Sequence, residues 1–197
     1  MGKDTNFAAL IGSRICHDLI SPIGAINNGI ELLEMSSTST SPEMALISES
    51  VQSASARIRF FRIAFGAAGE QTVGRPEIMS ILKDIYNGPR LSVAWGPLDG
   101  MMRGDLRLGF LALLCLETSM PFGGRIEVIQ NGDRLVLTGH ADKFNFDPEL
   151  WAQFQGDAGP QNLRAAHVQF GLMPLIAKDE GREITVEKDE TTLTLTI

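Results

Sequence analysis

A histidine and an aspartate stand side by side in the segment from Ser13 to Pro22, which reads SRICHDLISP. Histidine has an unperturbed pKa of about 6.5, so near pH 7 it offers a neutral ring nitrogen that can attack phosphorus. Asp18 adjoins His17, and Arg14 stands four residues before Asp18, the spacing at which opposite charges pair on a helix. Arg14, His17 and Asp18 are therefore candidates for phosphoryl chemistry.

One long amphipathic helix must position these side chains. Apolar residues recur every three or four positions from Ala8 to Leu33, which lays one apolar stripe along a helix. His17 lies on the opposite face and is predicted to point toward water or a partner. Pro22 follows about one turn later, where it removes a backbone hydrogen bond and bends the helix. The residues of the opposite face are polar or small: Ser13, His17, Ser21, Gly24, Asn28 and Glu31.

The small residues on this face suggest a docking groove. Ser21 and Gly24 follow His17 by one and two turns. A glycine inside a helix costs roughly 0.5–1 kcal/mol relative to alanine, so Gly24 calls for a reason other than helix stability. We interpret it as close approach of a partner helix. Local relief beside Pro22 is the alternative.

A second helix is predicted from Pro42 to about residue 68, after the break at 36–42. It also carries one apolar stripe, and two such helices cannot enclose a core by themselves. The length of both stripes favours a four-helix bundle formed by two chains, hence a homodimer through residues 4–68. Three arginines on this helix either dock an acidic partner or form a solvated face: Arg57, Arg59 and Arg62.

The remainder of the chain predicts a mixed α/β domain. A linker at 69–76 separates a helical domain, 1–70, from a second domain, 77–197. The fold class expected is α+β, with a sheet covered by helices on one face. Asn131-Gly132 predicts the turn of a hairpin. The expected helices are 77–86, 105–119 and 161–178, and the expected strands are 90–95, 125–130, 134–138, 182–187 and 191–197.

Composition excludes several classes. The 197 residues are 44% hydrophobic and 21% charged, as in globular proteins, and the net charge of −7 argues against a nucleic-acid partner. No signal peptide or membrane span is expected, which predicts a cytoplasmic protein. Cys16 and Cys115 are predicted to be reduced and buried. His140 and His167 have no metal-ligand spacing and are read as structural or surface residues.

A family resemblance sharpens the reading of the first helix. His17-Asp18-Leu19 followed by Pro22 resembles the H-box of histidine-kinase dimerisation domains. The longer string from Ser13 to Leu33 resembles the ChpT-type histidine phosphotransferases of alphaproteobacteria. The resemblance implies dimerisation through the helical hairpin and a phosphoryl group carried on His17. It also implies transfer between receiver-domain aspartates, from a hybrid histidine kinase to response regulators of the cell cycle.

The resemblance also implies roles around His17. Asp18 orients or polarises the imidazole, and Arg14 holds Asp18 or contacts the receiver. From the polar, small-residue face of the helix we further expect Ser21, Gly24 and Asn28 to contact the docked receiver. The Mg²⁺ required for transfer is expected from the acidic pocket of the receiver, so the chain needs no metal site of its own.

The second domain resembles the ATP-binding domain of histidine kinases in degenerate form. In that family the helix matching 106–120 carries asparagines that hold magnesium and phosphate, and here it has none. The adenine loop, aspartate-x-glycine-x-glycine in active kinases, is replaced by residues 138–144, TGHADKF. No cofactor is therefore expected. The alternatives are a histidine kinase with a divergent nucleotide site and a non-catalytic scaffold that binds receivers.

Overall fold

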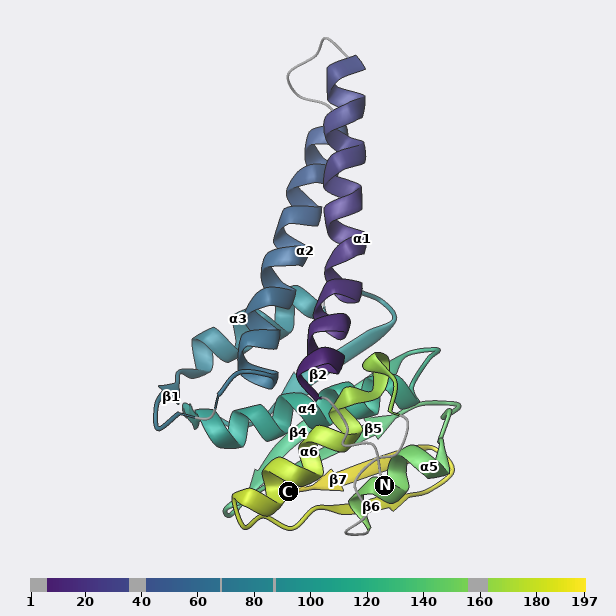
Figure 1. Ribbon diagram of the computed structural model, residues 1–197. Helices are drawn as coiled ribbons and strands as arrows, with labels where there is room; N and C mark the ends of the chain where they lie inside the picture. Colours follow the sequence, from purple (N-terminus) through teal and green to yellow (C-terminus); the bar gives the residue numbers. More distant parts are fainter. Residues whose placement is uncertain (1–6, 36–41, 68, 87, 156–162) are drawn as a thin grey trace.

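Two long helices form an antiparallel hairpin that projects from the rest of the molecule (Figure 1). The computed structural model describes residues 7–35, 42–67, 69–86, 88–155 and 163–197. Helix α1 runs over Phe7–Met35 and helix α2 over Pro42–Ala64, so Pro42 begins the second helix as predicted. Residues 36–41 of the predicted break lie outside the described residues.

Helix α2 ends at Ala64, about four residues before the predicted end. The reason lies in a side chain from another part of the chain. Arg103 donates from Nη2 to the carbonyl of Arg62 at 2.6 Å and from Nε to the carbonyl of Ala67 at 3.2 Å. At Gly66, a Cβ would lie 2.1 Å from the Arg62 carbonyl oxygen, so the tight turn that follows requires glycine.

A five-stranded sheet forms the base of the molecule. The strand order is β2-β4-β5-β7-β6, with β2 and β4 parallel and all other pairs antiparallel. Asn131 pairs with Arg134, so the turn of the predicted hairpin is Gly132-Asp133, one residue later than expected, with Gly132 at a φ of +65°. The bounds are β2 Leu91–Trp95, β4 Gly124–Asn131, β5 Arg134–His140, β6 Thr185–Lys188 and β7 Thr192–Thr196.

The remaining elements differ from the predictions at several places, since β3, α5 and η1 were not predicted and β6 begins three residues later than expected. The predicted linker contains a short strand, β1 (Thr72–Val73), which pairs with β3 (Met101–Met102). Helix α3 begins at Arg75, near the end of the predicted linker. The helix predicted from 161 begins at Val168, after a 3₁₀ turn, and residues 161–162 lie outside the described residues. The bounds are β1 Thr72–Val73, α3 Arg75–Ile85, β3 Met101–Met102, α4 Arg103–Ser119, α5 Pro148–Trp151, η1 Ala152–Phe154, η2 Ala165–His167 and α6 Val168–Asp179.

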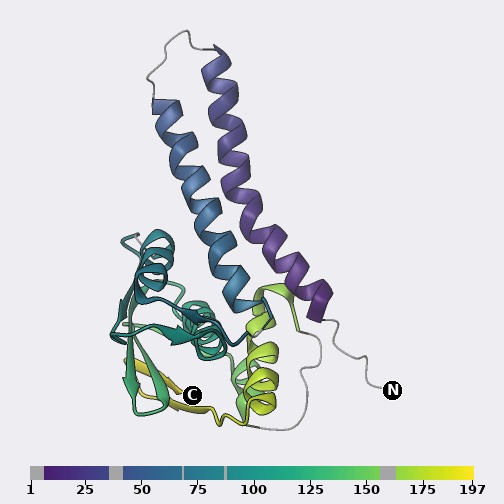
Figure 2. The same cartoon turned by 90° about the vertical axis from the view of Figure 1, so that its left-hand side faces the viewer.

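Helix α4 forms the centre of the core. With α6 it lies on one face of the sheet, between the strands and the base of the hairpin (Figures 1 and 2). Phe60 of α2 stacks on Phe110 of α4 with ring centroids 4.4 Å apart, so one hydrophobic core extends from the hairpin into the sheet domain. The mixed helix-and-sheet fold is thus as predicted. Helix α1 packs along α2 and also contacts α6 and η2.

Two of the three arginines of α2 contact α3. Arg59 donates to Ser80 at 3.3 Å and pairs with Asp84, and Arg62 lies 3.7 Å from Glu77. All three partners belong to α3, so these arginines hold α3 against α2. Arg57 instead faces α1. Among the helices of the described residues, none is both long and apolar enough to cross a membrane.

Candidate functional site

His17 presents its ring to solvent on the outer face of α1. Its side chain is 83% exposed, as the helical pattern predicts. The ring Nδ1 lies 3.0 Å from Oδ1 of Asp18. A neutral imidazole that donates its Nδ1 hydrogen to a carboxylate keeps the lone pair on Nε2. The geometry therefore makes Nε2 the nitrogen available for attack.

Asp18 is held by two arginines. Its side chain is only 11% exposed, and Nε of Arg14 donates to Oδ2 at 2.8 Å, as the spacing in the sequence predicts. Nη1 of Arg57 lies 4.0 Å from the same oxygen. The two guanidinium groups balance the carboxylate charge on one side, which leaves Oδ1 for His17 on the other. Sequence reasoning did not assign Arg57 to Asp18.

Arg14 makes a second contact, with the C-terminal domain. Its Nη1 donates to the carbonyl oxygen of Ala166 in η2. The Arg14 side chain is 15% exposed, so its guanidinium is engaged within the chain rather than presented to solvent. No sequence signal points to this contact, because 152 residues separate the two partners.

A polar cleft of about 370 Å³ separates the hairpin from the C-terminal half of α4. Arg14, Asp18 and Arg57 line its hairpin side. On the other side, Glu117 accepts from Arg90 at 2.9 Å and from Tyr86 at 3.4 Å. Burial, and then the negative charge of Glu117, hold the pKa of Tyr86 well above its usual range, so the hydroxyl keeps its proton and donates.

The predicted docking residues lie along the same side of α1 as His17. Ser21 and Asn28 are exposed and Gly24 is half-buried. A Cβ placed at Gly24 would meet no atom within 4 Å, so nothing in the chain requires glycine there. The structure thus leaves room beside Gly24 for another molecule.

Exposed apolar side chains form a second surface on the hairpin. Ile23 and Ile30 are spaced by seven residues on α1, as are Met44, Val51 and Ile58 on α2. All five are between 44% and 54% exposed. At 3.6 residues per turn, Ile23 and Ile30 lie about 120–140° around α1 from His17. The apolar surface and the His17 face are therefore different sides of the hairpin.

The prediction for the two cysteines was half wrong. Cys115 is buried, and that burial raises the pKa of its thiol well above the usual value. Cys16 is exposed, because it stands seven residues before Ile23 on the apolar surface that a single hairpin leaves uncovered.

The segment after β5 packs onto the last turn of α4. Trp151 donates from Nε1 to Oγ of Ser119 at 3.1 Å, and the Asn145 amide donates to the Ser119 carbonyl at 2.9 Å. Phe146 stacks on Trp151 with centroids 5.5 Å apart, and Phe170 contacts Trp151 edge-on at 5.2 Å. Aromatic rings thus cover the last turn of α4 at Ser119.

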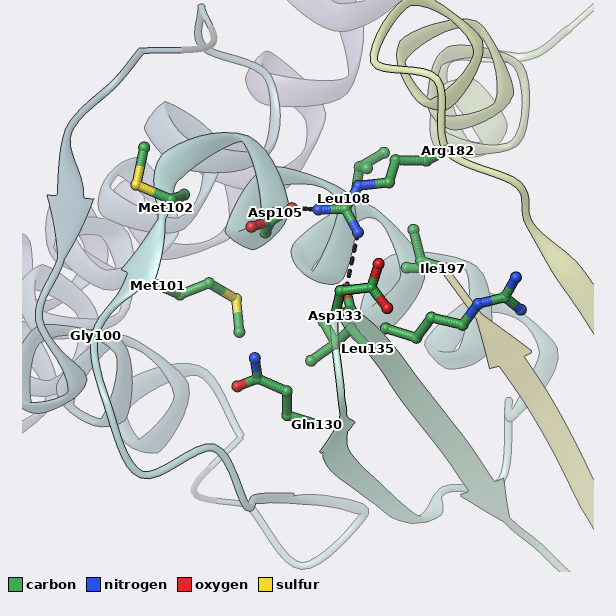
Figure 3. Close-up of a pocket in the computed structure, with 11 residues that line it drawn as sticks. Gly100, Met101, Met102, Asp105, Leu108, Gln130, Asp133, Leu135, Arg182 and Ile197 are labelled. Atoms are coloured by element: carbon green, nitrogen blue, oxygen red, sulfur yellow. Dashed lines mark hydrogen bonds and ion pairs between the residues drawn. The ribbon is translucent and has the colours of Figure 1, made fainter.

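A separate cavity of about 190 Å³ lies at the opposite end of α4 (Figure 3). Arg182 pairs with Asp105 there and donates to the Asp133 carbonyl at 2.8 Å. The arginine therefore ties the start of α4 to the β4–β5 turn and to the chain after α6. We interpret it as a structural clip, remote from the cleft beside Asp18.

The other two histidines contact residues other than His17 and Asp18. Nε2 of His140 is 3.8 Å from Glu127 on the neighbouring strand, and the ring of His167 meets Phe170 edge-on at 6.3 Å. Within the described part of the chain, no three His, Cys, Asp or Glu side chains gather as metal ligands.

Comparisons with known proteins agree on one family. The model of the family described as "Histidine phosphotransferase C-terminal domain" matches residues 75–192. The chain is 34% identical to "Protein phosphotransferase ChpT" of Brucella abortus (strain 2308), over 92% of this chain and 90% of that protein. A solved structure titled "1.7 Angstrom Structure of a Bacterial Phosphotransferase" superposes with a TM-score of 0.81 at 31% identity, covering 100% of this chain and 97% of the other.

Proposed function

The chain belongs to the ChpT-type histidine phosphotransferases of phosphorelays, and from this premise we propose that His17 carries the phosphoryl group between receiver-domain aspartates. The observation that carries the proposal is the contact between His17 and Asp18. An exposed imidazole whose Nδ1 faces a nearly buried carboxylate at 3.0 Å presents Nε2 to an incoming protein.

The proposed transfer is a single substitution at phosphorus between the receiver aspartate and His17. Nε2 attacks the phosphorus of an aspartyl phosphate, an N–P bond forms, and the bond from phosphorus to the aspartate oxygen breaks. The aspartate leaves as carboxylate, and the ring becomes a phosphorylated imidazolium that keeps its Nδ1 hydrogen. Asp18 stabilises that positive charge through the hydrogen bond at Nδ1. The reverse step delivers the phosphoryl group from Nε2 to the aspartate of a second receiver. Both steps depend mainly on alignment of the reacting atoms and on charge stabilisation.

The partners follow from this chemistry. A hybrid histidine kinase is the proposed donor and response regulators are the proposed acceptors, each through its receiver domain. Ser21, Gly24 and Asn28 form the proposed docking face beside His17. The receiver supplies Mg²⁺, and the absence of asparagines over residues 106–120 supports a chain that uses no nucleotide.

We further propose that two chains form a four-helix bundle through the hairpins. The heptad-spaced residues Ile23, Ile30, Met44, Val51 and Ile58 support this, since a second copy would cover them. The bundle would leave His17 accessible, because His17 lies on another side of α1.

The decisive experiment follows labelled phosphate from a phosphorylated receiver to this protein. The wild-type chain is expected to acquire an acid-labile, alkali-stable label, and the His17→Ala variant none. Label that persists on His17→Ala would move the site to another residue, with His140 and His167 as the next to test.

A further inference from the structure

We propose that Arg14 is a positioning residue for transfer at His17 and that the C-terminal domain anchors it. The inference rests on the proposed role of His17. It gives the domain that lacks the kinase nucleotide elements a task in the reaction, namely to fix the direction of the Asp18 carboxylate.

One guanidinium group makes two contacts in different directions. Nε of Arg14 donates to Oδ2 of Asp18 at 2.8 Å, and Nη1 donates to the carbonyl oxygen of Ala166. The guanidinium is planar and its donors have fixed directions, so two acceptors on different elements define its plane. The carboxylate of Asp18 takes its orientation from that plane, and its other oxygen faces His17.

The Ala166 carbonyl that accepts from Arg14 is also held by a buried side chain. Gln169 is fully buried, and its Nε2 donates to the Ala166 carbonyl at 3.2 Å and to Oγ1 of Thr118 at 2.9 Å. Thr118 in turn donates to the carbonyl of Leu114 at 2.8 Å, inside α4. Direct hydrogen bonds therefore connect the His17 ring to the central helix of the C-terminal domain.

The connection matters because the His17 ring is otherwise free. Exposed side chains change rotamer within picoseconds to nanoseconds, and a neutral imidazole exchanges between two tautomers. A fixed acceptor at Nδ1 selects one tautomer and one ring orientation, with the lone pair on Nε2. A misplacement of about 1 Å at a reacting centre can cost roughly a hundredfold in rate, so such selection is valuable.

Arg14 is poorly placed to act by binding the receiver directly. Its side chain is 15% exposed, and both ends of the guanidinium contact acceptors of the same chain. Positioning and docking therefore make opposite predictions about binding and rate, and kinetics can separate them.

The test measures single-turnover transfer from a phosphorylated receiver to the full chain. In Arg14→Gln we expect the rate constant at saturating receiver to fall about tenfold or more, while the dissociation constant for the receiver stays unchanged. The ¹⁵N shifts of His17 are expected to move from the Nδ1-H tautomer toward a mixture. In Arg14→Lys the ammonium pairs with Asp18 but cannot span both acceptors. Its saturating rate constant is therefore expected to lie between those of the wild type and Arg14→Gln. Arg62→Gln, which removes an exposed arginine on α2, serves as the matched control.

A second variant tests the anchor. Gln169→Met keeps the side-chain volume and removes the donor to Ala166. Gln169→Met is expected to lower the transfer rate constant in the wild-type background. In the Arg14→Gln background it is expected to cause no further decrease, because Gln169 would act only through Arg14. Equal slowing in both backgrounds would show that the C-terminal domain acts by another route. Thermal melting of each variant identifies losses that come from unfolding.

The outcomes separate this inference from the proposed function. If wild-type protein acquires no label on His17, the proposed function fails. If the wild type is labelled on His17 and Arg14→Gln transfers at the wild-type rate with an unchanged tautomer, only the positioning role is overturned. Weaker receiver binding with an unchanged saturating rate would make Arg14 a docking contact.

Discussion

Gly29 of α1 lies directly against Ile47 of α2. A Cβ at Gly29 would come within 2.4 Å of Cγ1 of Ile47 and 3.3 Å of the Glu43 carbonyl oxygen, whereas a Cβ at Gly24 would meet nothing within 4 Å. The glycines are five residues apart on one helix. Of these two glycines, Gly29 is the one whose missing side chain lets α1 and α2 approach closely.

The two glycines should therefore respond oppositely to alanine. Gly29→Ala is expected to lower the free energy of unfolding by about 1–3 kcal/mol, because the hairpin must open to admit the methyl group. Gly24→Ala is expected to raise it by roughly 0.5–1 kcal/mol, since alanine is the better helix former. Urea unfolding of both variants measures the difference. Equal effects would contradict the packing at Ile47.

Gly24 also tests the docking face. Gly24→Met should leave the fold intact, because space surrounds this position within the chain. It should slow transfer from a phosphorylated receiver by up to about a hundredfold, if the receiver packs over Gly24 and is displaced by about 1 Å. Transfer kinetics and thermal melting are measured together. A stable variant that transfers at the normal rate would show that receivers dock elsewhere.

The apolar surface of the hairpin predicts the oligomeric state. Light scattering of the wild type should give twice the mass of one chain. Ile30→Glu or Val51→Glu should give single chains, because a dimer would bury the added charge without a partner. Asn28→Glu, on the His17 face, should remain dimeric and is the control. A wild-type protein with the mass of one chain would exclude the bundle.

Nucleotide binding can also be measured directly. Residues 106–120 contain no asparagine, and residues 138–144 replace the adenine loop of active kinases. Calorimetric titration of the full chain with ATP and Mg²⁺ is therefore expected to show no saturable binding. Micromolar affinity would revive the alternative of a divergent histidine kinase. Phosphotransfer from a receiver in the same preparation confirms that the protein is folded and active.

His167 gives the stability a dependence on pH. Partial burial first, and then the positive charge of Arg164, lower the pKa of His167 below its ordinary value in the folded chain. As pH falls through about 6.5, the unfolded chain binds a proton before the folded chain does, so the folded state loses stability. The loss ends below the folded-state pKa, where both states are protonated.

His167→Gln should consequently unfold with a smaller difference between pH 8 and pH 5 than the wild type. At pH 8 the histidine is neutral in both states, so comparison there isolates the packing change from the titration. Urea midpoints at the two pH values provide the measurement. An unchanged difference would assign the pH dependence to other groups.

The sequence by itself determined the local features of this protein. The periodicity of the first helix put His17 on the exposed face, and the four-residue spacing predicted the pairing of Arg14 with Asp18. Pro42 marked the start of α2. The types of most elements followed in the same way, because hydrophobic period, turn residues and helix starts are properties of neighbouring residues.

Only the tertiary structure decided what distant segments do to one another. The early end of α2 depends on Arg103, and the second contact of Arg14 depends on Ala166. Arg57 faces Asp18 only because α1 and α2 pack together. No spacing in the sequence encodes these contacts, since each joins residues that folding brings together from different elements. The candidate nucleophile could therefore be predicted from the sequence of one helix, whereas some of the groups that orient it are found only in the folded structure.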